Sequence, residues 1–114
     1  MTLRSPRLFC AEITACAGRV IFIDLFGQLH PELLPELRTA LEAATSVKPR
    51  QLVVDLTNVE FICPEGYDAI GACRAGVERL TVCSKNDLAK RMLAILGHEG
   101  IEFTVGEVPD RDIA

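Results

Sequence analysis

Two short apolar segments near the N-terminus have the composition of β-strands. Residues 8–15 and 19–25 are rich in isoleucine, valine and phenylalanine, and Cys16-Ala17-Gly18 separates them. Two such segments joined by a short glycine-containing connection are typical of a β-hairpin. The pattern therefore predicts a sheet that begins with two antiparallel strands.

After Gly27 the apolar spacing changes to that of an α-helix. The apolar residues of this segment fall along one stripe of a helix: Leu33, Leu37, Leu41 and Ala44. The first residue of the helix stays open, because either Pro31 or Pro35 could occupy the first position. A proline further along would cost a backbone hydrogen bond.

The middle of the chain predicts a buried strand followed by a second helix. Residues 51–56 form an almost continuous apolar run, as in strands that are buried on both faces, and a polar turn follows at 57–58. The helix is expected to begin after Cys63. Its predicted sheet-facing side consists of small residues: Ala69, Ala72, Cys73, Gly76 and Val77. The opposite side, which carries Tyr67, Gly71 and Arg74, is then expected to face solvent.

The C-terminal third predicts a strand, a helix and a last strand. Residues 80–83 predict a short buried strand, and Ser84 with Asp87 three residues later is typical of a helix N-cap and first turn. The helix is expected to end at Gly97, a residue that suits a left-handed cap, before a strand at 101–105. Its predicted core stripe is apolar: Leu88, Met92, Ile95 and Leu96.

The order β-β-α-β-α-β-α-β predicts a single α/β domain over residues 1–114. Helical crossovers require parallel neighbours after the opening hairpin, so we expect a mixed sheet of about five strands with three main helices. A chain of 114 residues with 49% hydrophobic residues can build one core. The ends, 1–7 and 109–114, are expected to be loose tails.

Charge and composition argue against nucleic-acid and membrane partners. The formal net charge is −4, and the chain has no tryptophan and no cluster of basic residues of the kind that binds phosphate backbones. The longest apolar block, 20–23, is interrupted at Asp24, far short of the ~20 residues of a membrane-spanning helix. The N-terminus lacks the pattern of a secretory signal peptide. We therefore expect a cytoplasmic protein.

Catalytic and metal chemistry find little support in the sequence. The five cysteines contain no C-x-x-C pair and the two histidines are far apart, so no metal site is predicted. Cys63 with His30 could form a nucleophile and base, but neither an orienting group nor an oxyanion site accompanies them. No glycine-rich phosphate loop follows a strand. The chain is thus predicted to be no enzyme and to use no cofactor, with Cys63 as its most exposed and reactive thiol.

The order of predicted elements and residues 53–66 resemble one known family. The stretch runs Val53-Val54-Asp55-Leu56-Thr57-Asn58-Val59-Glu60-Phe61-Ile62-Cys63-Pro64-Glu65-Gly66. It is similar to the STAS domain of anti-sigma-factor antagonists, in which a strand ends in Asp-Leu-Ser/Thr and a loop ends in Phe-Ile-Asp-Ser-Ser-Gly. The resemblance extends to Gly27-Gln28-Leu29, where the family has a Gly-x-Leu/Ile-Asp turn, and to the helix end at 91–97.

The resemblance implies a regulator that sequesters an anti-sigma factor with a kinase-like fold. In the family, that kinase phosphorylates the second serine of Asp-Ser-Ser-Gly and so weakens binding. This sequence departs from the motif in two places. Cys63, Pro64 and Glu65 replace Asp-Ser-Ser, and His30 replaces the acid of the Gly-x-Leu-Asp turn. The resemblance therefore implies a protein that is not switched by phosphorylation at position 65.

Two interpretations of Glu65 are compatible, and both stay open. Proline at the first position of a helix followed by an acid is an ordinary helix start, because the acid meets the positive end of the helix dipole. Alternatively, the fixed charge of Glu65 takes the place of a switchable phosphate. Both interpretations put Glu65 at an exposed helix N-terminus.

The expected partner surface follows from the resemblance together with the predicted helix faces. It comprises residues from three segments: His30, Thr57, Asn58, Cys63, Pro64, Gly66, Tyr67, Gly71 and Arg74. The alternative function is a STAS interaction module of a transporter or of another signalling assembly. Nucleotide binding, which some STAS domains show, is a family precedent without support from these residues.

Overall fold

The computed structural model describes residues 2–5 and 9–106, which form a six-stranded mixed sheet. The strands lie in chain order across the sheet: β1 (Thr2–Ser5), β2 (Phe9–Cys16), β3 (Val20–Leu29), β4 (Gln51–Ile62), β5 (Arg79–Ser84) and β6 (Ile101–Val105). The pairs β1–β2 and β2–β3 are antiparallel, and every later pair is parallel. The predicted mixed α/β fold with an opening hairpin is confirmed.

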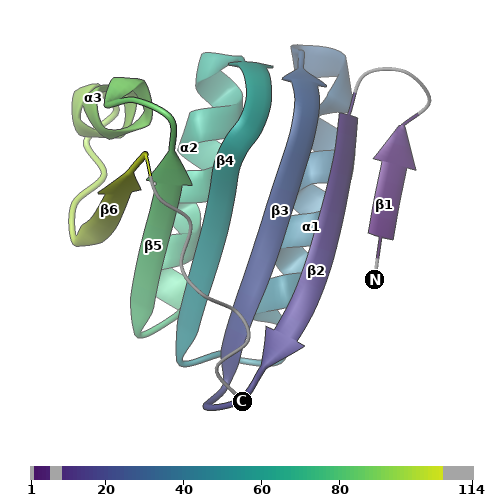
Figure 1. The fold of residues 1–114 in the computed structure, drawn as a ribbon, viewed down its shortest axis with the longest axis vertical. Coiled ribbons are helices and arrows are strands. Elements are labelled where there is room, and N and C mark those ends of the chain that lie inside the picture. Colours follow the sequence, from purple (N-terminus) through teal and green to yellow (C-terminus); the bar gives the residue numbers. More distant parts are fainter. Residues whose placement is uncertain (1, 6–8, 107–114) are drawn as a thin grey trace.

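Three α-helices connect the parallel strands within the described residues: α1 (Leu34–Thr45), α2 (Pro64–Ala72) and α3 (Leu88–Ile95). Short 3-10 turns precede α1 (Pro31–Leu33) and follow α2 (Cys73–Gly76). Helices α1 and α2 lie side by side on one face of the sheet, whereas α3 lies at the end where β5 finishes (Figure 1). This arrangement leaves the carboxyl ends of β3, β4 and β5 at one edge of the molecule.

Strand β1 corrects the expectation of a loose N-terminal tail. Thr2–Ser5 pairs with β2 in antiparallel register from Thr2↔Glu12 to Ser5↔Phe9. An edge strand of four residues is held by backbone hydrogen bonds, so it needs no apolar periodicity that a sequence pattern could reveal. The remaining predicted tail residues, including 109–114, lie outside the described residues.

The opening hairpin turns through two residues with positive φ. Gly18 has φ 77° and Arg19 has φ 61°, between the paired residues Cys16 and Val20. Glycine adopts this conformation without a Cβ penalty, which explains its place in the turn. The turn thus occupies 17–19, one residue later than predicted.

The start of the first helix uses both prolines. Pro31 opens the 3-10 turn, and Pro35 is the second residue of α1, where the missing N–H would have had no partner within the helix. The predicted stripe is buried and is extended by Leu34 and Ala40.

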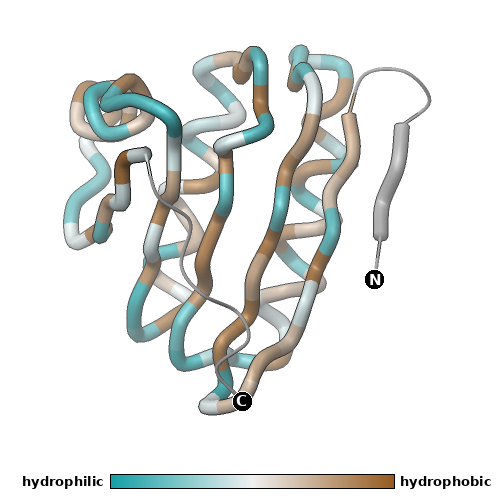
Figure 2. Tube along the Cα trace, viewed as in Figure 1, coloured by the Kyte–Doolittle hydropathy of each residue, from teal (hydrophilic) through white to brown (hydrophobic). Residues whose placement is uncertain are grey.

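The core lies between the sheet and the helices, and each α-helix contributes one fully buried large side chain. These are Leu37 from α1, Ile70 from α2 and Leu93 from α3. In the central strand β4, Leu52 and Val54 join this cluster while Val53 joins a smaller one on the other face. The prediction of a strand buried on both faces is confirmed, and Figure 2 shows long hydrophobic segments in β3 and β4.

Helix α2 turns the opposite face to the sheet from the one predicted. Its buried residues are Gly66, Tyr67, Ile70 and Gly71. The small residues assigned to the core are exposed or half-buried, apart from Val77. Two causes are visible. The large side chain of Ile70 fixes the buried side, and the helix tightens to 3-10 geometry at Cys73, which shifts the phase of every later residue.

Helix α3 also differs from its prediction at its start and in its buried face. It begins at Leu88, whose N–H donates to Asn86 Oδ1 at 3.0 Å, while the Ser84 hydroxyl donates to the Asn86 carbonyl. Ser84 therefore belongs to the preceding turn and caps no helix. The fully buried residues of α3 are Ala89 and Leu93. Of the predicted stripe, Met92 and Leu96 pack partly against the core, whereas Leu88 and Ile95 are exposed.

The end of α3 confirms the predicted left-handed cap. Gly97 has φ 84°, its N–H donates to Ala94 O at 3.0 Å, and the His98 N–H donates to Leu93 O at 2.9 Å. This pair of bonds is the Schellman motif, which satisfies carbonyls at a helix end.

Candidate functional site

The carboxyl ends of β3 and β4 meet the N-terminus of α2 at one edge of the sheet. The two strands are paired in parallel as far as Leu29↔Ile62, and the Cys63 N–H donates to Leu29 O at 3.0 Å. In open α/β sheets, ligands bind outside the carboxyl ends of parallel strands. This edge is therefore the first place to look for a functional site.

The strand pair reaches this edge through bulges in β4. The register shifts between Asp24↔Asp55 and Phe26↔Asn58, and again between Gly27↔Val59 and Gln28↔Phe61. Each shift places an extra residue in β4, which bends the strand. The predicted polar turn at 57–58 is thus wrong, because β4 continues through it.

Asp55 accounts for the first bulge. Its Oδ1 accepts hydrogen bonds from the Thr57 N–H at 2.9 Å and from the Thr57 hydroxyl at 2.7 Å. The side chain thereby replaces a partner that the regular ladder would have supplied. Thr57, predicted to contact a partner, is half-buried and directed back towards Asp55, whereas Asn58 is exposed.

A connected set of side chains covers the edge between β3 and β4. Gln28 Nε2 donates to Glu60 Oε2 at 3.0 Å, and Gln28 Oε1 lies 3.0 Å from His30 Nε2. With this amide orientation, His30 Nε2 is the donor. The His30 ring stacks on Phe61 with the centroids 5.1 Å apart and the planes inclined by 29°.

This stack leaves a large aromatic side chain facing solvent. Phe61 is 45% exposed, although Leu29 and Ile62, the last residues of β3 and β4, are buried. Its ring stacks on His30, which bonds to Gln28, and Gln28 in turn donates to Glu60. The edge therefore presents a preorganised aromatic surface, and His30, one of the residues predicted to contact a partner, lies in it.

The start of α2 agrees with the predicted helix start. Cys63 is the N-cap with extended backbone angles, Pro64 is the first residue, and Glu65 lies exposed in the first turn. Gly66 is buried, and a Cβ at this position would lie 2.6 Å from Leu29 Cδ2 and 2.7 Å from Ile62 Cγ2. Glycine at this position thus has a packing reason.

The prediction of an exposed Cys63 is wrong. The residue is only 2% exposed and belongs to the main core cluster, because its extended N-cap backbone turns the side chain inwards. Cys83 is also buried, while Cys10, Cys16 and Cys73 are intermediate. Burial raises the pKa of the Cys73 thiol to about 11.

Alkylation should therefore follow burial. We expect iodoacetamide at pH 8 to label Cys10 and Cys16 first and to leave Cys63 and Cys83 unmodified until the protein unfolds. Cys73 should lag, because a thiol with a pKa of about 11 is about one part in a thousand thiolate at that pH. Peptide mass spectrometry of timed samples measures the order, and early labelling of Cys63 would contradict the buried N-cap.

Three residues that were predicted for the partner surface are engaged inside the fold. Tyr67 is buried, and this burial raises the pKa of its hydroxyl. Gly71 packs against the His98 ring, and Arg74 donates to Gly100 O and to Val77 O at 2.9 Å each. These three positions therefore hold α2 to the C-terminal elements.

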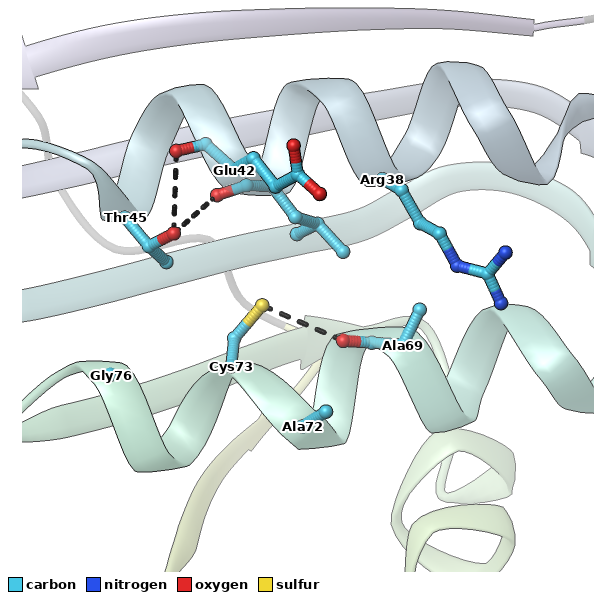
Figure 3. A pocket seen from close by; sticks show the side chains of 8 residues that line it. Arg38, Glu42, Thr45, Ala69, Ala72, Cys73 and Gly76 are labelled. Atoms are coloured by element: carbon cyan, nitrogen blue, oxygen red, sulfur yellow. Dashed lines mark hydrogen bonds between the residues drawn. The ribbon is translucent and has the colours of Figure 1, made fainter.

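The small face of α2 lines a shallow groove against α1 instead of the sheet. The groove has a volume of about 300 Å³ and lies between α1 and α2. The side chains of Thr45 and Cys73, which line it, bond to carbonyls four residues earlier in their own helical segments. In Figure 3, Cys73 Sγ points along α2 to the Ala69 carbonyl, and the Thr45 hydroxyl bonds to carbonyls of α1. Arg38 reaches from α1 towards α2.

A second groove, of about 350 Å³, lies beside the aromatic edge and was missed by the sequence analysis. It runs between the end of β4 and α3, with Phe61 and Val59 on one side and Leu88 and Met92 on the other. Lys85 also lines it. The available signal was the apolar stripe of α3, which the sequence analysis assigned to the core.

Among residues 2–5 and 9–106, no group of three histidine, cysteine or acidic residues is placed to hold a metal ion. No helix in this part of the chain has the length and apolar character needed to cross a membrane.

Comparison with known proteins places the fold. No family model and no curated protein sequence matches the chain. An anti-sigma factor antagonist from Mycobacterium paratuberculosis superimposes with a TM-score of 0.70 at 22% identity, over 83% of both chains. The fold is that of the anti-sigma-factor antagonists.

Further structures with this STAS-type fold are also similar to the chain. The antagonist SpoIIAA in its unphosphorylated form has a TM-score of 0.65 at 12% identity, over 83% of this chain and 88% of that one. The Bacillus SpoIIAA in its phosphorylated form gives 0.64 at 12% identity, over 83% and 91%. At these identities the shared property is the fold.

Proposed function

We propose that this chain is a cytoplasmic protein-binding regulator of the anti-sigma-factor-antagonist type, with an anti-sigma factor of kinase-like fold as its partner. The STAS-type fold supports this proposal, since two solved relatives of that fold are named as such antagonists. A binding protein needs an accessible, rigid surface more than it needs reactive groups. The carboxyl edge of β3 and β4 supplies such a surface.

The observation that carries the proposal is the exposed Phe61 held by His30. Aromatic side chains dominate the energetics of protein interfaces, and a side chain that is already ordered loses little conformational entropy on binding. Phe61 meets both conditions, because the stack and the Gln28–Glu60 hydrogen bond fix its surroundings. Asn58, Pro64 and Glu65 are exposed nearby on β4 and α2.

Glu65 makes this surface permanently acidic. A phosphoserine carries about −1.5 to −2 charges and three acceptor oxygens, whereas a glutamate carries one charge and two oxygens. Position 65 offers no hydroxyl, and the nearby Thr57 hydroxyl is occupied by Asp55. We therefore propose that partner binding is not reset by phosphorylation in this loop.

Titration with a candidate anti-sigma factor of kinase-like fold tests the binding surface. We expect Phe61→Ala to weaken the Kd by about tenfold or more. Val47→Ala is the matched control: Val47 is also a large exposed apolar residue, 65% exposed, but it follows α1 at the other end of the sheet. Its Kd should stay within about twofold of wild type.

Incubation with the same candidate kinase and ATP tests whether the chain is phosphorylated and how the charge of Glu65 affects binding. We expect the intact mass of the wild type to stay unchanged and Glu65→Ser to bind the kinase more tightly, by roughly 1 kcal/mol, because one carboxylate leaves the contact. Cys63→Asp is not a suitable second substitution, because it would place a carboxylate in the core. Equal Kd values for Phe61→Ala and Val47→Ala, or phosphate on wild-type residues 57–66, would contradict the proposal.

A further inference from the structure

Helix α3 carries an apolar stripe that the core covers only in part. Leu88, Met92 and Ile95 recur at i, i+4 and i+7 and so lie on one side of the helix. Leu88 is 48% exposed and Ile95 is 77% exposed. Ala89 and Leu93, on the adjacent side, already make the buried contact. Met92 packs partly against the core. The packing of the fold therefore does not explain why Leu88 and Ile95 are apolar.

Two residues of the stripe, Leu88 and Met92, form one wall of the groove beside the aromatic edge. Leu88 and Met92 stand opposite Phe61 and Val59 across a volume of about 350 Å³, and Ile62 and Pro64 also line it. The exposed apolar surface of α3 is thus continuous with the surface that carries the proposed function. A groove walled by a helix on one side and a strand end on the other fits a convex, elongated ligand.

The two walls differ in charge. Residues 85–96 contain three basic residues and one acidic residue, in a chain whose net charge is −4. Lys85 lines the groove itself, and Arg91 pairs with Asp87 at 3.0 Å on the solvent side of α3. Glu60 lies on the β4 wall. The α3 wall therefore favours an acidic ligand, and the β4 wall does not.

We propose that this groove binds an amphipathic helix of the partner protein, with acidic residues on the flank that faces α3. Its apolar residues would pack against Phe61, Leu88 and Met92, as in the helix-in-groove mode of recognition. The inference rests on the proposed function in one respect, that the chain acts by binding a protein. It does not depend on the partner being an anti-sigma factor.

Charge favours this occupant over two others. An anionic bilayer would attract Lys85 and Arg91, but Glu60 and Glu65 at the same edge would face its headgroups, and a concave groove does not match a flat surface. A second copy docked through the same face would bring two basic α3 helices together, which places like charges in contact. A partner helix with an acidic flank meets neither obstacle.

Two synthetic peptides of about 16 residues test the groove directly. Both carry leucine at i, i+3, i+4 and i+7; one has glutamate and the other lysine along the flanks. We expect the glutamate peptide to bind the wild type at least about tenfold tighter, as measured by fluorescence anisotropy. Lys85→Glu should reduce that preference.

Two variants of α3 with the same added charge locate the binding. Leu88→Glu should weaken the glutamate peptide by about tenfold or more. Ala94→Glu is the control, because Ala94 is exposed on the opposite side of α3 and should change the Kd by less than about threefold. Equal effects of the two variants, or equal affinity for the two peptides, would overturn the proposal. Thermal unfolding checks that both variants stay folded.

Sedimentation with vesicles and binding of a candidate anti-sigma factor distinguish a membrane site from a protein site and the groove inference from the proposed function. The wild type should stay in the supernatant with phosphatidylglycerol vesicles, and sedimentation that Leu88→Glu abolishes would assign the groove to membranes instead. If the anti-sigma factor binds wild type and Leu88→Glu equally, the groove inference fails while the proposed function stands. If the peptides behave as expected but the anti-sigma factor does not bind, the proposed partner is wrong and the groove stands.

Discussion

Leu93→Ala is expected to lower the free energy of unfolding by about 2–5 kcal/mol, whereas Ile95→Ala should change it by less than about 0.5 kcal/mol. Leu93 is fully buried between α3 and the sheet, so its removal leaves a cavity. Ile95 lies two residues further along the same helix and faces solvent. Urea denaturation of both variants gives the comparison.

The comparison of Leu93→Ala with Ile95→Ala shows which face of α3 belongs to the core. The sequence pattern assigned Ile95 to the core, and the structure assigns Leu93. If Ile95→Ala were the more destabilising change, α3 would be rotated relative to this description. The apolar wall of the groove would then be lost with it.

Gly66→Ala should lower the free energy of unfolding by about 1–3 kcal/mol through overpacking. The added Cβ would lie 2.6 Å from Leu29 Cδ2 and 2.7 Å from Ile62 Cγ2, so either these two side chains or α2 must shift. Gly76→Ala is the matched control, because a Cβ there meets no atom within 4 Å. It should be neutral or slightly stabilising.

This comparison links the motif glycine to the geometry of the site. Gly66 allows the first turn of α2 to pack on the two strand ends that carry His30 and Phe61. Equal stability of the two variants, measured by thermal and urea unfolding, would show that α2 does not pack as closely as described.

The order of elements could be predicted because each element has a pattern long enough to reveal its type. The α1 stripe repeats over more than three turns, and the apolar run of β4 and the terminal Gly97 of α3 are strong local features. Such patterns depend on chain-local physics, namely helical periodicity, strand alternation and capping. The structure accordingly confirms them.

The faces of α2 and α3 could not be predicted in the same way. In the segment 64–77, five small or apolar positions suggested the sheet-facing side, whereas the structure buries the larger side chains of Tyr67 and Ile70. In α3, the apolar arc is wider than the contact with the sheet, so Leu93 and Ile95 looked equivalent until their neighbours were known. Both errors arise because helical periodicity reports apolar character and not the position of the sheet.

The site was predicted in part for similar reasons. The motif placed His30 and residues 63–66 at one edge, because the ends of parallel neighbours meet there. The stack of His30 on Phe61 and the bulge held by Asp55 depend on register between β3 and β4, which no local pattern specifies. Cys63 was misplaced because its N-cap backbone turns the thiol inwards.

Hydrogen exchange of the chain with and without a candidate anti-sigma factor shows whether the carboxyl edge of β3 and β4, with the adjoining groove, is the protein-binding surface. We expect slower exchange at 28–30 and 57–66 and along α3, and unchanged exchange in the groove between α1 and α2. Protection confined to α1 and α2, with residues 57–66 unaffected, would contradict the account.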